Sequence, residues 1–69
     1  MEKLKKIWFN GYEYETKQKL TIKKLIYYFK YENLFVLEYN SMICNKKIWN
    51  TVLIENGDKI EIITLVGGG

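Results

Sequence analysis

The sequence has no arginine, alanine, proline or histidine, and its single cysteine is Cys44. Without histidine, the chain lacks the most common general base and the most common metal ligand of proteins. One cysteine excludes an internal disulfide and a zinc site built from several cysteines. We therefore expect no bound metal or cofactor. We interpret Cys44, which follows Ile43, as a small buried hydrophobic residue and not as a thiol relay.

Long hydrophobic runs are also missing. No apolar stretch approaches the roughly 18 residues of a membrane span, and the first lysines are not followed by the apolar segment of a signal peptide. We expect a protein of the bacterial cytoplasm or of the plastid stroma, with no membrane partner. The 69 residues suffice for one domain with a dense core, and 48% of them are hydrophobic and 16% aromatic.

Positive charge comes from lysine alone, and 11 lysines against 8 acids give a net charge of +3. Specific readers of nucleic acid usually grip it with arginine. The coding bias of an AT-rich genome explains this composition, so we expect no nucleic-acid partner. The six tyrosines are spread over different elements and are interpreted as structural. A small basic nucleic-acid-binding β module is the alternative from another class, and its affinity for single strands would fall steeply with salt.

Hydrophobic periodicity and turn signals predict a hairpin followed by one helix. Residues 4–9 and 12–17 alternate as strands, and Asn10-Gly11 favours a turn with two positive φ angles. Thr21 is a plausible helix N-cap. The helix has an apolar stripe and can end at Asn33 in the left-handed conformation. The stripe consists of Ile22, Leu25, Ile26 and Phe29.

The second half predicts further strands and turns. Strands are expected at 35–39, 42–44 and 59–66, and residues 52–54 are a candidate for another. Residues 46–49 read as a helical turn, in which Trp49 belongs to the core or clamps the turn. Asn56-Gly57-Asp58 is a tight turn and not a phosphate loop. The predicted core is Ile7, Phe9, Leu25, Ile26, Phe29, Leu37, Ile60 and Ile62.

This order of elements predicts an α+β fold with one helix packed across a mixed sheet. The last strand is the most apolar, so we place it in the sheet centre, parallel to the first strand. Trp8, Ile63 and Leu65 then face away from the helix. Such an aromatic-aliphatic patch would suit a partner, although scattered apolar residues on an ordinary sheet face explain it equally well.

Three glycines, Gly67, Gly68 and Gly69, follow the last strand directly. They have no side chains with which to pack or catalyse, and glycine loses the most freedom when it becomes ordered. We expect residues 1–66 to form the domain and residues 67–69 to form a flexible tail. A narrow channel could admit Gly67 and Gly68, and the reactive group would be the α-carboxylate of Gly69.

These residues together resemble the ThiS family, the ubiquitin-like sulfur carriers of thiamine thiazole biosynthesis. The likeness covers nearly the whole chain. It rests on Asn10-Gly11, Leu20-Thr21, Asn40, Trp49, Asn56-Gly57-Asp58 and the ending Ile60-Glu61-Ile62-Ile63-Thr64-Leu65-Val66-Gly67-Gly68-Gly69. The chain departs from the family at three positions. Ser41 stands where glycine is common, Asn45 where proline is frequent, and Lys24 where glutamate is frequent.

The resemblance implies a β-grasp fold and a protein co-substrate, not an enzyme. A ThiF-like adenylating enzyme would use ATP with magnesium to convert the Gly69 carboxylate to an acyl-adenylate. A persulfide derived from cysteine desulfurase would attack it, and the resulting thiocarboxylate would give its sulfur to a ThiG-like thiazole synthase. Trp8, Ile63, Leu65 and Val66 are the candidate partner-binding residues. The nearest alternative within this chemistry is the small subunit of molybdopterin synthase, which uses the same kind of tail.

Overall fold

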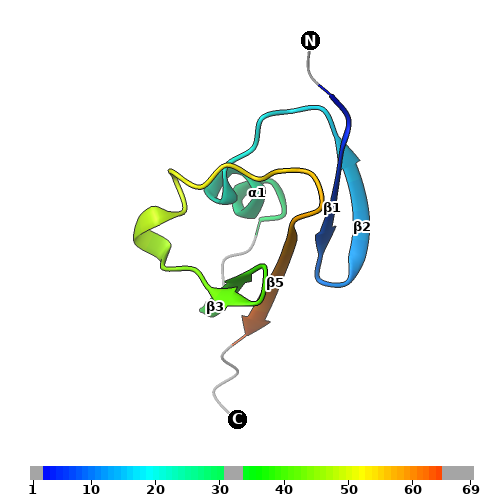
Figure 1. Ribbon diagram of the computed structural model, residues 1–69. Helices are drawn as coiled ribbons and strands as arrows, with labels where there is room; N and C mark the ends of the chain where they lie inside the picture. Colours follow the sequence, from blue (N-terminus) through cyan, green and yellow to red (C-terminus); the bar gives the residue numbers. More distant parts are fainter. Residues whose placement is uncertain (1–2, 31–33, 65–69) are drawn as a thin grey trace.

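The computed structural model describes residues 3–30 and 34–64. In these ranges a mixed five-stranded sheet has the order β2-β1-β5-β3-β4. The strands are β1 (Lys5–Phe9), β2 (Tyr12–Thr16), β3 (Phe35–Tyr39), β4 (Met42–Ile43) and β5 (Lys59–Thr64). The helix α1 (Ile22–Tyr28) covers one face of the sheet, and the 3₁₀ turn η1 (Lys46–Ile48) follows β4 (Figure 1). The predicted β-grasp architecture is confirmed.

The last strand lies in the sheet centre, as its apolar sequence predicted. β5 pairs parallel with β1, where Phe9 is opposite Ile60, and antiparallel with β3, where Leu37 is opposite Ile62. Figure 1 shows β5 between the β1–β2 hairpin and β3. Both long neighbours therefore hold β5 by backbone hydrogen bonds, and the side chain of Ile60 is 0% exposed.

Two hairpins turn through residues with positive φ. Asn10 and Gly11 have φ of 52° and 82°, as the Asn-Gly pair predicted. Asn40 and Ser41 have φ of 51° and 72° between β3 and β4. The second turn therefore places a serine where glycine is the unstrained residue.

The helix starts as predicted, because the Thr21 side chain accepts a hydrogen bond from the Lys24 backbone N–H at 3.2 Å. It ends earlier than predicted. Phe29 caps the helix, and Lys30 takes the left-handed conformation with φ 57°. Asn33, the predicted end, lies outside the described residues.

Phe29, the residue that caps the helix, packs against the first hairpin. Its ring stacks on Phe9 with 4.4 Å between ring centroids, and it meets Tyr14 edge-on at 5.3 Å. Aromatic pairs in such geometries add to the stabilisation from buried area. Phe29 therefore ties the end of α1 to both strands of the first hairpin.

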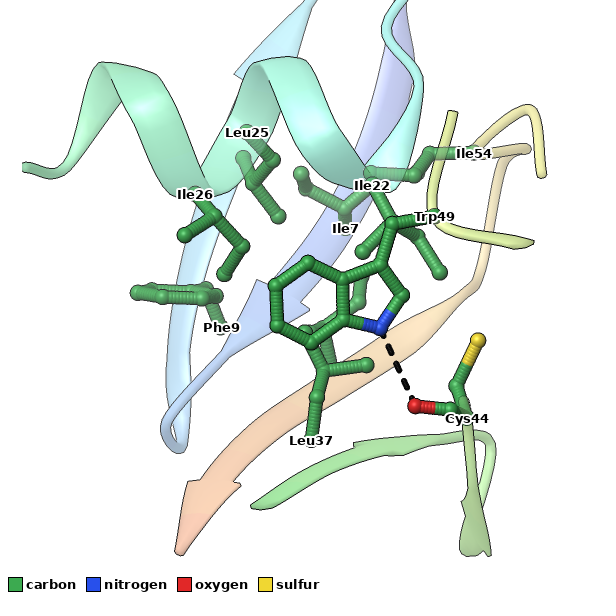
Figure 2. Close-up of a cluster of buried hydrophobic side chains, with 10 residues drawn as sticks. Ile7, Phe9, Ile22, Leu25, Ile26, Leu37, Cys44, Trp49 and Ile54 are labelled. Carbon is green, nitrogen blue, oxygen red and sulfur yellow. Dashed lines mark hydrogen bonds between the residues drawn. The ribbon is translucent and has the colours of Figure 1, made fainter. Parts of the chain in front are cut away.

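The core lies between α1 and the sheet, and most of the predicted core residues are in it. In Figure 2 the side chains of Ile22, Leu25 and Ile26 point from the helix towards the strands. The predicted Phe29 and Ile62 are partly buried against this cluster. The buried residues are Ile7, Phe9, Ile22, Leu25, Ile26, Leu37, Cys44, Trp49, Ile54 and Ile60.

Irregular segments complete the core. The Trp49 indole is buried and stacks on Phe35 at 5.5 Å, while its Nε1 donates to the backbone oxygen of Cys44 at 3.0 Å (Figure 2). Trp49 is thus both core and clamp. Residues 52–54 form no full strand, because only an isolated bridge joins Leu53 to Thr21, but Ile54 is deeply buried.

Candidate functional site

The candidate site is the end of β5, since this strand leads into the residues predicted to carry the chemistry. Leu65, Val66, Gly67, Gly68 and Gly69 lie outside the described residues. The described part of the site is therefore the strand itself, the turns that hold it and the open face of the sheet around it.

Asn10 holds β5 beyond the last residue of β1. Its backbone N–H donates to the Ile60 oxygen at 3.0 Å. Its side-chain oxygen accepts from the Ile62 N–H at 2.7 Å. A side-chain amide thus replaces the backbone acceptor that a longer β1 would supply. The same residue also adopts the positive φ that reverses the chain, which asparagine tolerates better than most residues.

The start of β5 is held by Asn40 from the β3–β4 turn. The Asn40 N–H donates to the Lys59 oxygen at 2.7 Å, and the Lys59 N–H donates to the Asn40 side-chain oxygen at 2.8 Å. The Asn40 side-chain nitrogen donates to Asp58 Oδ1 at 3.1 Å. One turn residue therefore makes both backbone and side-chain bonds to Lys59, the first residue of β5, and a side-chain bond to Asp58 just before it.

Asp58 gathers three donors at this point. Its Oδ2 accepts from the Glu55 N–H at 2.7 Å and from the Tyr39 hydroxyl, and Asn40 contacts its other oxygen. Burial and then the bond to Asp58 raise the pKa of Tyr39 well above its usual value. The carboxylate therefore acts as a structural acceptor that joins β3 to the turn before β5.

The turn before β5 also fixes the first strand. The Asn56 side-chain oxygen accepts from the Lys6 N–H at 2.8 Å, and the Gly57 N–H donates to the Lys6 oxygen at 2.7 Å. Gly57 has φ 89°. As predicted, Asn56-Gly57-Asp58 is a tight turn, and its polar groups bind the protein's own backbone.

The open face of the sheet carries two of the predicted partner-binding residues, Trp8 and Ile63, with exposures of 36% and 44%. They share the face but do not form one patch. Trp8 is opposite Lys59 on β5. Ile63 is four residues further along, roughly 13 Å at the rise of a strand, and Glu61 lies between them. Leu65 and Val66 lie outside the described residues.

Each of the two residues has different neighbours. Ile63 is opposite Val36 on β3, which makes an aliphatic pair. Trp8 helps to line a shallow hollow with Asn10, Gly11 and Glu61. Trp8 and Ile63 are therefore separate apolar contact points on the open face, with the Glu61 carboxylate between them. Ile43, opposite Glu38, is a further exposed apolar residue of this face.

Cys44 lies in the core and not on the open face of the sheet. Its side chain is 8% exposed in the core, and burial raises the pKa of its thiol. Thiolate is the nucleophilic form of cysteine, and a raised pKa makes it scarce. Its backbone oxygen is used by Trp49. This agrees with the interpretation of Cys44 as a packing residue.

No three His, Cys, Asp or Glu side chains within residues 3–30 and 34–64 gather as metal ligands. No helix in the described part of the chain is long and apolar enough to cross a membrane.

The amide and carboxylate contacts that hold β5 were not predicted from the sequence. All four residues were assigned to turns. Missed were the use of Asn10, Asn40 and Asn56 as acceptors for distant backbone groups, and of Asp58 as an acceptor for the distant side chains of Tyr39 and Asn40. The available signal was that each asparagine stands at a predicted strand end, where unpaired backbone donors are expected.

Comparison with known proteins agrees with this architecture. The ThiS family model matches residues 7–69. The ycf40 protein of Trieres chinensis is 50% identical over 66 residues, covering 94% of this chain and 90% of that protein. The ycf40 protein of Porphyra purpurea is 31% identical over 64 residues, covering 91% and 90%.

A solved structure is also similar. The crystal structure of the thiamine biosynthesis protein ThiS from Geobacter metallireducens superimposes with a TM-score of 0.79, at 19% identity, over 93% of this chain and 99% of that one. At this identity the likeness shows the fold alone. The family match and the two relatives extend over almost the whole sequence, so the chain belongs to the ThiS family of ubiquitin-like sulfur carriers.

Proposed function

We propose that this protein carries sulfur for the synthesis of the thiamine thiazole, on a thiocarboxylate formed at Gly69. The observation that carries the proposal is the ThiS family match, which extends through the three glycines. The ThiS structure that shares the fold bears the name of a thiamine biosynthesis protein. This favours the thiazole branch over the small subunit of molybdopterin synthase. ThiS-like carriers are generally co-substrates and not catalysts.

The chemistry would proceed on the tail and within partner enzymes. A ThiF-like enzyme with ATP and magnesium joins the Gly69 carboxylate oxygen to the α-phosphate, and pyrophosphate leaves. The terminal sulfur of a persulfide, supplied through cysteine desulfurase, then attacks the carbonyl carbon and displaces AMP. This forms a C–S bond and leaves the persulfide's own S–S bond in place. A second thiol then attacks the inner sulfur of that S–S bond, forms a disulfide with it and releases the thiocarboxylate on Gly69. A ThiG-like thiazole synthase accepts its sulfur.

The chain's own part would be to present the tail from a fixed point. β5 is held on both edges by β1 and β3. Asn10 and Asn40 add side-chain bonds near its two ends. Because β5 is fixed before binding, less conformational entropy has to be lost when the tail enters a channel of the enzyme. Gly67 and Gly68 then pass through space too narrow for any Cβ.

The sheet face would meet the adenylating enzyme through Trp8 and Ile63, together with Leu65 and Val66. Because Trp8 and Ile63 are separated along β5, they would fill two distinct pockets on the enzyme. Trp8→Ala should weaken binding of the adenylating enzyme about tenfold, as expected for an aromatic anchor. Ile63→Ala tests the second contact point in the same way. Unchanged affinity in both variants would assign the face to ordinary surface.

The decisive experiment follows the mass of the intact protein. After incubation with ATP, a ThiF-like enzyme and a persulfide donor, the protein should gain the mass of a sulfur-for-oxygen exchange. Deleting Gly68 and Gly69 shortens the reach by roughly 7 Å and should abolish both ATP-pyrophosphate exchange and the mass gain. Residues added after Gly69 should also abolish the exchange and the mass gain, because they move the carboxylate away from Gly69. Activity in either variant would contradict the mechanism.

We further propose the bacterial cytoplasm or the plastid stroma as its location. The two relatives come from algae, whose plastids are of bacterial descent. The lysine-rich composition fits a genome of high AT content. Fractionation that found the protein in neither compartment would refute the assignment.

A further inference from the structure

Charged side chains are divided between the two sides of this fold. The open face of the sheet, which carries Trp8, also carries the four acids of the strands. These are Glu13, Glu15, Glu38 and Glu61, against two lysines on the same face, Lys6 and Lys59. The segments 17–30 and 44–51, which contain α1 and η1, have no acid. Their lysines are all exposed and are Lys17, Lys19, Lys23, Lys24, Lys30, Lys46 and Lys47.

The helix brings part of this charge together around one tyrosine. Lys23, Tyr27 and Lys30 are spaced four and three residues apart, so they lie along one face of the helix and its end. Lys19, Lys23, Lys24 and Tyr27 line one shallow hollow together with Thr21 and Asn50. We call Lys19, Lys23, Lys24, Tyr27 and Lys30 the lysine surface.

The end of η1 adjoins this surface. The Lys23 N–H donates to the Trp49 oxygen at 3.1 Å, and the Trp49 N–H donates to the Lys46 oxygen at 3.2 Å. Lys46 and Lys47 thus extend the positive region beyond the helix. In the described ranges none of the seven lysines forms an ion pair, and the recorded pair, Lys6 with Glu13, belongs to the open sheet face.

Among the described residues, the Tyr27 side chain makes no hydrogen bond or ring contact. It is 83% exposed, whereas Phe29, two residues later, packs against Phe9 and Tyr14. An exposed tyrosine offers a large apolar ring and a hydroxyl, and such residues are frequent binding anchors in interfaces. Surrounded by lysines, it would anchor a partner whose charge is negative.

We propose that the lysine surface docks an acidic segment of a partner protein, on the side of the molecule opposite the acidic sheet face. Carboxylates are attracted to it over a long range, which steers encounter and orientation. The inference concerns binding alone and does not rest on the chemistry proposed for Gly69.

Two other kinds of partner fit the surface less well. Without arginine, it has no planar fork to grip phosphates in the bidentate way that nucleic-acid readers use. A membrane-surface helix inserts an exposed apolar face, but in α1 the apolar residues Ile22, Leu25 and Ile26 are buried in the core. An acidic protein segment needs neither feature.

A pair of charge reversals tests the location. In Lys23→Glu with Lys24→Glu, the affinity for a fluorescent oligoglutamate peptide at low salt should fall at least about tenfold. The matched control, Lys6→Glu with Lys59→Glu, changes the net charge equally on the open sheet face. It should lower the affinity by less than about threefold, because Lys6 and Lys59 lie on the opposite face and act on the peptide only over a long, screened distance. Equal losses would mean that binding follows net charge, and would overturn the proposal.

Three more measurements test the anchor and the occupant. Tyr27→Ala should weaken peptide binding about threefold or more with an unchanged melting temperature, and unchanged binding would overturn the docking surface. Tighter binding of a thymidine oligonucleotide of equal charge would assign the surface to nucleic acid instead. Self-association at low salt that Glu38→Lys abolishes would make a second copy of this chain the occupant. Either result would refute an acidic partner segment.

Discussion

Ser41, in the β3–β4 turn, has a strained backbone conformation that a substitution could relieve. Its φ of 72° lies in the left-handed region, which costs a residue with a Cβ about 1–2 kcal/mol. Glycine avoids that cost but loses roughly 0.5–1 kcal/mol more on folding. Ser41→Gly should therefore stabilise the protein by about 0.5–1 kcal/mol. For a domain of this size, that raises the melting temperature by roughly 2–8 °C.

The first hairpin offers the reciprocal substitution. Gly11 has φ 82°, and a Cβ added there would meet no atom within 4 Å. Gly11→Ser should therefore be destabilising through backbone conformation alone, by about the amount that Ser41→Gly gains. Ser41→Ala keeps the Cβ and removes the hydroxyl, so it should stay within about 0.5 kcal/mol of the natural protein.

Urea unfolding followed by tryptophan fluorescence measures all three variants. A shift of the midpoint at constant slope reports a change in the free energy of unfolding and not in the compactness of the unfolded state. The reasoning fails if Ser41→Gly leaves the midpoint unchanged, or if Ser41→Ala stabilises as much as Ser41→Gly does. The second result would assign the effect to the hydroxyl.

Three further predictions concern the support of β5. Asn10→Gly keeps the turn conformation but removes the acceptor of the Ile62 N–H, so it should cost about 1–2 kcal/mol in urea unfolding, whereas Asn10→Ala should cost about 1 kcal/mol more; equal costs would contradict the assigned strain. Ile62→Ala should lower the free energy of unfolding by about 2 kcal/mol, near the low end for aliphatic truncation, because Ile62 is only partly buried. A loss of only a few tenths of a kcal/mol would show that the Ile62 side chain points away from the core. Folding raises the pKa of the Tyr39 hydroxyl, so the stability gained from this group is complete below its unfolded pKa near 10 and is lost as the pH rises further. Tyr39→Phe should therefore lessen the loss of stability at alkaline pH. A variant whose stability falls with pH as in the natural protein would refute this.

Regular patterns in the sequence predicted the regular parts of the fold. Alternation located β1, β2, β3 and β5, and the Asn10-Gly11 pair located the first hairpin. The apolar stripe located the buried face of α1. These features repeat with the period of their own element, so each can be read without knowing its neighbours.

The irregular parts could not be predicted in this way. Ile54 is deeply buried in a segment without periodicity, and only its position after the Thr21–Leu53 bridge brings it into the core. The helix ends at Phe29, whose ring stacks on Phe9, a residue far away in the sequence. Both features involve tertiary contacts.

The separation of Trp8 from Ile63 has a similar origin. Alternation correctly puts both residues on the open face, but it does not specify which residue of β5 lies beside Trp8. The parallel register, with Trp8 beside Lys59, is set by the bonds that Asn56, Gly57 and Asp58 make to β1. Turn residues thus decide whether two exposed side chains form one patch or two.

The same turns position β5 without any contribution from the glycines that follow it. Asn10 at the first hairpin and Asn40 at the second bind β5 from opposite edges. The position of the strand is therefore fixed by contacts that precede the glycines and do not involve them. Changes in Gly67, Gly68 or Gly69 should then alter sulfur chemistry without altering stability. Changes in Asn10 should lower stability without altering the chemistry proposed for Gly69, so mutation can separate the stability of the fold from that chemistry.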